Sequence, residues 1–301
     1  MSLINIGKQI TIYVGWSLLA IGIVGNGINI FIFSSVQNYR QTPCTFYFLI
    51  SSIDNLLILF VNLLSRILIL GYEIDLTKTS LFWCKFRSYT INVFPLSSFS
   101  YSCLSSIDQY LLTSRNVQIR RLSQIKYSYR IVFFLTLFWF IHAIPQILFF
   151  DNSSQQTCSN TNPSYSIYNT IYILTFSSTF PILIMIIFGY FTYCNIQLIR
   201  TLNEHQIDYQ LLRMTLFQII LILITVGPYG INHLYELIQS FVNKNKSENE
   251  SLISTIFSLL YYVNFSGNCY MFLICSRRFR RQVKHRLFFF RYKQNQINPT
   301  Q

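Results

Sequence analysis

The sequence predicts an all-α membrane protein: a seven-transmembrane helix bundle followed by a C-terminal amphipathic helix at the membrane interface. The first observation is composition, because 52% of the 301 residues are hydrophobic and only 11% are charged, against about 25% in soluble domains. So few charges cannot cover a water-exposed surface, and lipid must cover much of the chain. The second observation is seven apolar runs, each long enough for the roughly 20 residues that a span needs. The third is a net charge of +13 that lies mostly between and after those runs.

These runs divide the chain into a short extracellular N-terminus (1–9), the bundle (10–274) and a cytoplasmic amphipathic helix and tail (275–301). The first run lacks a small-residue cleavage site and is too long for an h-region, so we expect a span and no signal peptide. The predicted spans are Ile10–Ser35, Thr45–Gly71, Phe86–Leu112, Arg130–Phe150, Ile167–Ile199, Leu211–Phe241 and Ser251–Ile274. The second, third and seventh are rich in Ser, Asn and Asp, which must face neighbouring helices rather than lipid.

The distribution of Lys and Arg sets the orientation, because short cytoplasmic loops are enriched in them. One set of connections carries Arg40, Arg115, Arg120, Arg121, Lys126, Arg200 and the arginine-rich tail. The opposite set carries five lysines diluted by Glu73, Asp75, Asp151, Glu248 and Glu250. We therefore expect a multi-pass plasma-membrane protein with its N-terminus outside and its C-terminus inside. This segregation argues against nucleic acid as a partner, since that would need a soluble basic face.

Three N-glycosylation sequons test this orientation. They begin at Asn152, Asn245 and Asn249, and all three fall in predicted outside loops, where acceptors must lie. A fourth match at Asn264 lies within a span, and we interpret it as chance.

Two cysteines are predicted to face the oxidising side. Cys84 opens the third span, and Cys158 is the only cysteine in the loop between the fourth and fifth spans. A disulfide between them is physically allowed, and we expect it to hold that loop across the mouth of the bundle. The remaining five cysteines are expected to be reduced and structural.

The segment after the seventh span has apolar residues every three or four positions, with Arg and Lys between them. Phe279, Val283, Leu287 and Phe290 form the apolar side. This pattern is typical of a basic amphipathic helix at the inner lipid surface; the alternative is a disordered basic tail. Cys275 either carries a palmitate or is a buried thiol.

Several motifs, in their order and spacing, resemble the rhodopsin-like (class A) G-protein-coupled receptors over about residues 25–280. "GIVGNGINI" places Asn26 at the first-span asparagine, and "LISSIDNLL" places Asp54 at the second-span aspartate. "FLTLFWF" supplies the fourth-span tryptophan, and Pro181 and Pro228 match the prolines of the fifth and sixth spans. The chain looks like a divergent member, with "SSIDQYL" similar to peptide receptors of the invertebrate kind.

The resemblance implies a cytoplasmic switch at Asp108, Gln109 and Tyr110. Gln109 follows Cys84 by 25 residues, which is the family's spacing for an arginine held by the preceding acid at rest. Glutamine has no charge and fewer donors, so it cannot form that ion pair. The sixth and seventh spans depart too: Val226 replaces a tryptophan, and Asn268 keeps the asparagine of a motif that lacks its proline and tyrosine.

The resemblance also implies a polar cluster around Asp54. In the family this aspartate helps to hold a sodium ion with polar groups from the third and seventh spans, which here are Ser98, Asn264 and Asn268. An oxygen-rich pocket around one carboxylate suits a small hard cation. The alternative is a hydrogen-bonded packing cluster with Asp54 protonated. Apart from this allosteric sodium, no cofactor is expected.

The ligand is expected at the outer mouth, where the candidate residues are Arg66, Asn92, Tyr229, His233 and Glu236. Ile91 stands where amine receptors carry an aspartate, and Tyr262 stands where opsins carry the retinal lysine, so neither ligand class is favoured. Arg66 and Glu236 on opposite sides of the mouth would suit a peptide carrying both charges. The alternative is that they pair with each other or extend to the interface.

These observations favour a receptor for an extracellular peptide or small ligand that signals to heterotrimeric G proteins. A ligand-binding or decoy protein without G-protein output is the alternative. A transporter should show broken or charged helices in paired halves, and no such symmetry is present. The chain is not expected to be an enzyme, because its four histidines are scattered and no catalytic constellation is found.

Overall fold

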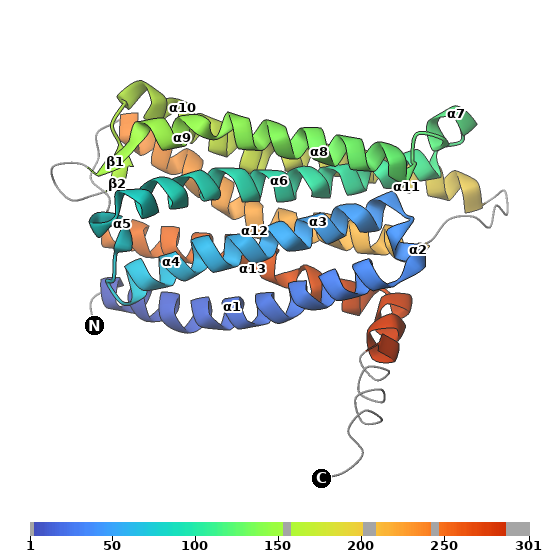
Figure 1. Ribbon diagram of the computed structural model, residues 1–301, viewed down its shortest axis with the longest axis horizontal. Helices are drawn as coiled ribbons and strands as arrows, with labels where there is room; N and C mark the ends of the chain where they lie inside the picture. Colours follow the sequence, from blue (N-terminus) through green and yellow to red (C-terminus); the bar gives the residue numbers. More distant parts are fainter. Residues whose placement is uncertain (1–2, 153–157, 201–208, 242–246, 287–301) are drawn as a thin grey trace, which may run out of the picture.

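The computed structural model describes residues 3–152, 158–200, 209–241 and 247–286, and most of them are helical. Figure 1 shows the long helices side by side along the length of the molecule. One end carries the N-terminus, α5 (Leu76–Thr79), β1 (Phe150–Asn152) and β2 (Cys158–Asn160), and is called the outer end below. The other end carries α2 (Gln37–Arg40), α7 (Val117–Arg120) and the C-terminal helix, and is called the inner end.

All seven predicted spans are helical apart from a turn at Ala143 and the strand residue Phe150 in the fourth, which confirms the seven-helix bundle. The first is α1 (Leu3–Ser35), and the second runs without a break through α3 (Pro43–Leu57), η1 (Ile58–Leu63), α4 (Leu64–Arg66) and η2 (Ile67–Gly71). The third is α6 (Leu81–Thr113), and the fourth is α8 (Ile125–His142) followed by α9 (Ile144–Phe149). The fifth combines α10 (Pro163–Ile173), η3 (Leu174–Thr179) and α11 (Phe180–Arg200). The sixth and seventh are α12 (Tyr209–Phe241) and α13 (Glu248–Cys275).

The helices extend beyond the apolar runs because polar caps start them early. Ser80 accepts a hydrogen bond from the Trp83 amide at 3.3 Å, so α6 begins five residues before the predicted Phe86. Ser247 and Glu250 form a reciprocal capping box that starts α13 at Glu248. Likewise α1 begins at Leu3 and includes most of the segment 1–9, which was predicted to precede the first span.

Five helices are long and apolar enough to cross a membrane by length and composition, within the residues that the structure describes. The third and seventh spans, α6 and α13, are more polar. Most of their serines and asparagines are buried between helices, whereas phenylalanines such as Phe82, Phe133 and Phe134 are exposed at the surface. This inside-out arrangement of polar and apolar groups is the one expected of a bundle surrounded by lipid.

The third span, α6, is the centre of the bundle and contacts α3, α8, α11 and α12. It runs unbroken through Pro95, although a proline removes one hydrogen bond of the helix ladder. Elsewhere in the bundle, α1 packs closely on α13. Gly22 allows this approach, because a Cβ at this position would lie only 2.8 Å from the Ser266 Oγ.

At the inner end, residues 277–286 form a helix that turns away from the bundle axis (Figure 1). Phe279 and Val283 are buried, and Phe279 lies 5.5 Å from the Phe33 ring and 6.0 Å from the Phe272 ring. The predicted apolar side therefore packs on the bundle at these two positions. The other two residues of that prediction, Leu287 and Phe290, lie outside the described residues.

Candidate functional site

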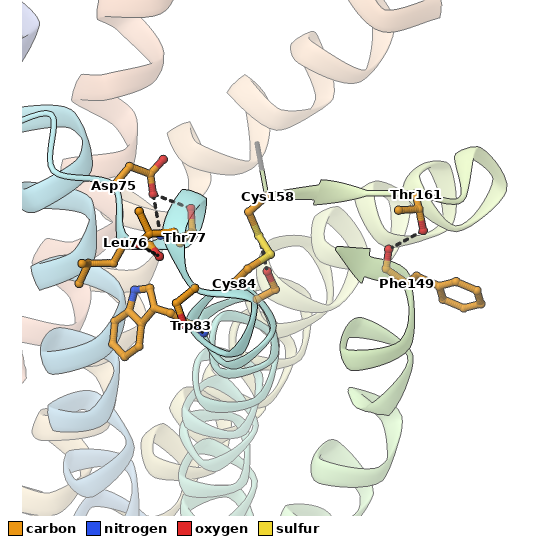
Figure 2. The surroundings of a disulfide bond; sticks show 11 residues. Asp75, Leu76, Thr77, Trp83, Cys84, Phe149, Cys158 and Thr161 are labelled. Carbon is orange, nitrogen blue, oxygen red and sulfur yellow. Dashed lines mark hydrogen bonds between the residues drawn. A yellow bond between two sulfur atoms is a disulfide. The ribbon is translucent and has the colours of Figure 1, made fainter. Parts of the chain in front are cut away.

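A disulfide and a short hairpin form the roof of the outer end, as Figure 2 shows. Cys84 at the start of α6 is bonded to Cys158, with 5.7 Å between the two Cα atoms, so the predicted disulfide is confirmed. Cys158 begins β2 (Cys158–Asn160), which pairs antiparallel with β1 (Phe150–Asn152). The Phe149 carbonyl accepts two hydrogen bonds from Thr161, each at 2.9 Å, and these close the hairpin.

Next to the disulfide, the short helix α5 (Leu76–Thr79) closes the opposite side of the mouth (Figure 2). Asp75 caps it by accepting hydrogen bonds from the Thr77 amide at 3.0 Å and the Thr77 hydroxyl at 2.5 Å. Just before it, Glu73 has a φ of 59°, in the left-handed region, and its carboxylate lies 2.8 Å from the Lys8 ammonium. That ammonium lowers the pKa of the Glu73 carboxyl below its usual value, first by hydrogen bonding and then by charge.

Beneath this roof lie two adjoining cavities. The outer one, called the vestibule, has a volume of about 390 Å³, and the inner one has a volume of about 70 Å³. Both are lined by Arg66, Ile91, Asn92 and Ile173, so they meet at these residues. The inner cavity is otherwise lined by apolar side chains and by polar ones, among them Asn62, Ser177, Tyr229, Ser258, Tyr261 and Tyr262.

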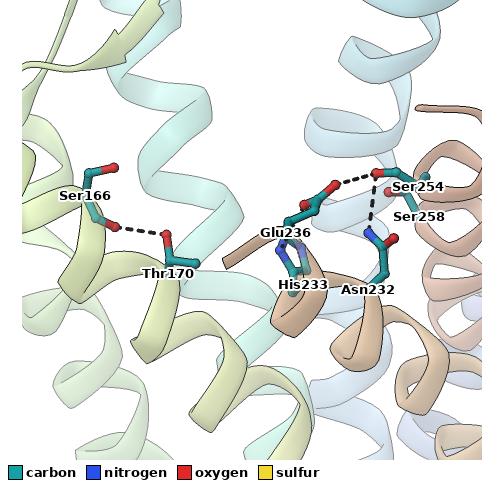
Figure 3. Close-up of polar contacts among 7 residues, drawn as sticks. All are labelled: Ser166, Thr170, Asn232, His233, Glu236, Ser254 and Ser258. Atoms are coloured by element: carbon teal, nitrogen blue, oxygen red, sulfur yellow. Dashed lines mark hydrogen bonds and ion pairs between the residues drawn. The ribbon is translucent and has the colours of Figure 1, made fainter. Parts of the chain in front are cut away.

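Three of the five predicted ligand residues line these cavities: Arg66, Asn92 and Tyr229. The other two, His233 and Glu236, line neither. Instead Glu236 accepts a hydrogen bond from the Ser254 hydroxyl at 2.9 Å and lies 3.6 Å from His233 Nδ1, as Figure 3 shows. The structure therefore does not pair Arg66 with Glu236. Both side chains interact electrostatically with the Tyr229 hydroxyl.

Sequence reasoning missed Arg87, which lines the vestibule and donates a hydrogen bond from its Nε to the Ser65 hydroxyl at 2.7 Å. A charged side chain one residue inside the predicted third span was a usable signal, because such residues in spans are costly unless they serve a purpose. The prediction also missed Tyr261, which stacks on Tyr229 with 4.2 Å between ring centroids. No sequence signal separated it from an ordinary packing aromatic.

The polar cluster in the middle of the bundle is centred on Asn55, not on Asp54. Asn55 Nδ2 donates to Asn26 Oδ1 at 3.4 Å, and Asn55 Oδ1 accepts from the Ser98 hydroxyl at 2.7 Å. Ser51 joins the Ser98 hydroxyl at 2.9 Å. Asp54 instead accepts a hydrogen bond from Ser97. Adjacent residues on a helix point about 100° apart, so only one of them can face Asn26 and Ser98.

The predicted sodium site is therefore not assembled around Asp54. Within the described residues, no hydrogen bond joins its carboxylate to Ser98, Asn264 or Asn268. Asn264 Oδ1 and Asn268 Oδ1 are buried and have no hydrogen-bond partner in the same part of the chain. The oxygens around Asn55 are all neutral. They do not fit the carboxylate-centred site that was predicted, because the charge that would balance a cation faces Ser97.

At the inner end, the three predicted switch residues lie on the last turns of α6. Asp108 accepts a hydrogen bond from the Ser123 hydroxyl at 2.5 Å, in the segment between α7 (Val117–Arg120) and α8. Gln109 is only 3% exposed, and its Nε2 has no hydrogen-bond partner among the described residues. Tyr110 packs between Phe188 and Phe191 of α11, with ring centroids 5.5 and 5.9 Å away.

A further hydrogen bond joins α6 to α12, farther from the inner end of α6 than the three switch residues. Gln218 Nε2 donates to the Ser102 hydroxyl at 2.8 Å, and both side chains are almost completely buried. Sequence reasoning did not identify this pair, because a glutamine and a serine separated by 116 positions carry no local signal of their contact.

Of the three predicted glycosylation acceptors, Asn152 ends β1 and Asn249 lies exposed in the first turn of α13, both at the outer end. Asn245 lies outside the described residues. Their glycosylation stays a prediction.

The family described as 7 transmembrane receptor (rhodopsin family) matches residues 25–270, which include the vestibule, the polar cluster and the three switch residues. No curated protein matches the chain.

Proposed function

Because the chain belongs to the rhodopsin family of seven-transmembrane receptors, we propose that it binds an extracellular peptide in the vestibule and activates heterotrimeric G proteins at the inner end. The chain is a multi-pass membrane protein, and the family implies an extracellular ligand and a G-protein partner in general. The peptide, the coupling and the plasma-membrane location are the parts that we propose.

The continuity of α6 is the observation that carries this proposal. The same helix supplies Ile91 and Asn92 to both cavities and Asp108, Gln109 and Tyr110 to the inner end. A ligand that shifts or rotates the outer half of a rigid helix also displaces its inner half. A receptor needs this property, since the two sites must be coupled through a shared element.

The charge distribution supports an orientation in which the inner end faces the cytoplasm and the outer end faces the extracellular side. The inner end carries Arg40, Arg120, Arg121 and the basic residues of the helix 277–286. The outer end carries the disulfide, which forms in an oxidising compartment. Both features agree with this orientation, because short cytoplasmic loops are enriched in Lys and Arg.

The lining of the cavities supports a peptide ligand. The vestibule is large enough for a short segment of chain, since ligand sites usually measure about 300–1,000 Å³. Its walls combine arginine side chains with backbone-like amides such as Asn92 and Asn169, and the inner cavity adds tyrosine hydroxyls. These groups can recognise peptide bonds and charged termini together.

The switch region supports coupling through a neutral contact. Asp108 is held by the Ser123 hydroxyl, so the connection between α6 and α8 takes the place of an ion pair within α6. Gln109 keeps an amide nitrogen without a partner in the described part of the chain, at the position where a G protein would need a donor.

Gln109→Arg tests the coupling directly. Arginine restores a charge and brings five N–H donors, so we expect nucleotide exchange on a purified G protein to increase about tenfold, which corresponds to about 1.4 kcal/mol. Exchange is measured in membranes, with and without a panel of synthetic peptides.

Gln118→Arg is the matched control, because Gln118 is exposed on α7 at the same end and the change adds the same charge. An equal increase in this variant would show a nonspecific effect of charge. If neither the natural chain nor Gln109→Arg exceeds receptor-free membranes with any peptide, the G-protein part of the proposal is wrong.

A further inference from the structure

Two arginines face the vestibule without a carboxylate to neutralise them fully. Arg66 and Arg87 interact electrostatically with each other and with the Tyr262 hydroxyl, so both guanidinium groups lie in one region. Arg66 lines both cavities, and Arg87 lines the vestibule. Two cations brought together in a partly desolvated site repel each other, and a structure that keeps them there needs a compensating anion.

The neighbouring acids do not provide that anion. Glu236 is engaged by Ser254 and His233, and Arg66 forms no ion pair within the described residues. Asp75 does attract Arg87, but its carboxylate is already the cap of α5 and accepts two hydrogen bonds from Thr77. With Arg66, Arg87 and Lys78 against Asp75, the charged residues that line the vestibule sum to 3 − 1 = +2.

Some guanidinium N–H donors of the two arginines are also available to a ligand. Arg87 is held by its Nε bond to Ser65, the residue directly before Arg66, and its side chain lines the vestibule. The Nε of Arg66 is buried and has no hydrogen-bond partner in the described part of the chain. The guanidinium fork binds planar oxyanions in a bidentate manner.

We propose that Arg66 and Arg87 form a carboxylate-binding subsite, which holds a free carboxylate of the ligand at the junction of the two cavities. This inference rests on the proposed function, since it assigns a chemical class to the ligand of the same cavity. The C-terminal carboxylate of a peptide and an acidic side chain share this chemistry. An amidated, uncharged C-terminus does not provide it.

N-acetylphenylalanine and its C-terminal amide are suitable probes, because they differ only in the carboxylate and both carry an aromatic ring for the tyrosine-lined wall. A ligand of this size typically has a dissociation constant of about 1 mM. At about ten times that concentration, the acid should raise the melting temperature of the full chain in lipid nanodiscs by about 2 °C. The amide should leave it unchanged.

Arg66→Gln and Arg87→Gln should each weaken the affinity for the acid at least tenfold, since each removes a charge-assisted bond. Lys85→Gln is the control, because it removes the same charge from the same helix at a residue that lines neither cavity. Arg66→Lys keeps the charge but loses the fork, so it should be intermediate. The melting temperature of each variant without probe shows whether it is folded.

Three results would overturn the subsite: equal stabilisation by acid and amide, full stabilisation by the acid in Arg66→Gln, or no stabilisation of the natural chain at 10 mM acid. Stabilisation by phenyl phosphate but not by the acid would overturn the choice of carboxylate. The readout needs no G protein. A chain that binds the acid but drives no exchange therefore contradicts only the coupling, and one that couples without preferring the acid contradicts only the subsite.

Discussion

The outer and inner ends of the bundle are held together by different kinds of contact. The outer end has a disulfide, capped helix starts and an ion pair, and these surround two arginines that have no full counter-charge. The inner end has no covalent link among the described residues. It is held by hydrogen bonds such as Gln218–Ser102 and Asp108–Ser123 and by aromatic packing around Phe33.

This difference indicates where the molecule can move. A covalent link and caps fix the loops around the vestibule before a ligand arrives, which lowers the entropic cost of binding. Single neutral hydrogen bonds each contribute only about 1 kcal/mol, so a binding event can exchange them. We expect the loops around the vestibule to stay nearly rigid, while a shift of α6 opens the inner end.

Removing the disulfide should have the largest effect on stability and on binding at the vestibule. The two cysteines are 74 residues apart, and closing a loop of that length stabilises a fold by about 4 kcal/mol in the chain-entropy description. Cys84→Ser should therefore lower the melting temperature by several degrees and abolish binding at the vestibule. Thermal unfolding in nanodiscs and probe binding measure the two effects.

The double variant Cys84→Ser/Cys158→Ser should behave like the single one, since the bond is already lost. Cys275→Ser is the control, because that thiol is free. A single variant as stable as the natural chain would mean that the caps and the hairpin alone fix the outer end.

Breaking the Gln218–Ser102 bond should have a smaller effect, and at the opposite end. Gln218→Leu removes a hydrogen bond of about 1 kcal/mol that joins α6 to α12, which shifts a two-state equilibrium about fivefold. Spin labels at two exposed positions, Arg115 just beyond the end of α6 and Arg213 near the start of α12, should then report a larger share of long distances.

Ser102→Ala should give the same shift, and the double variant should add little, since both remove one bond. Unchanged distances in all three variants would mean that aromatic packing, and not this bond, holds α12 against α6.

The sequence predicted the spans and the disulfide because both depend on properties that are local in the chain: apolar length, and a cysteine on each of two outer connections. It could not decide between Asp54 and Asn55, because both are polar neighbours and only the rotation of the helix selects the one that faces Asn26. The π-helical segments η1 and η3 change such rotations further, and both supply residues to the inner cavity, Asn62 and Ser177. His233 and Glu236, predicted ligand residues on α12, line neither cavity, because the rotation of that helix could not be predicted from the sequence either.

The Lys8–Glu73 ion pair should have the smallest effect, although it belongs to the outer end. Its partners are exposed, and surface pairs contribute little because water and salt screen them. The folded-state pKa of Glu73 is lowered, so its stabilisation is present above the unfolded pKa of about 4.5 and is lost as the pH falls through the folded value. At neutral pH, Glu73→Gln should lower the melting temperature only slightly, and the difference should vanish in about 1 M salt and once the pH has fallen below the folded pKa of Glu73. Lys8→Gln should match it. A large loss at neutral pH would mean that this contact, and not the disulfide with its caps, makes the outer end rigid.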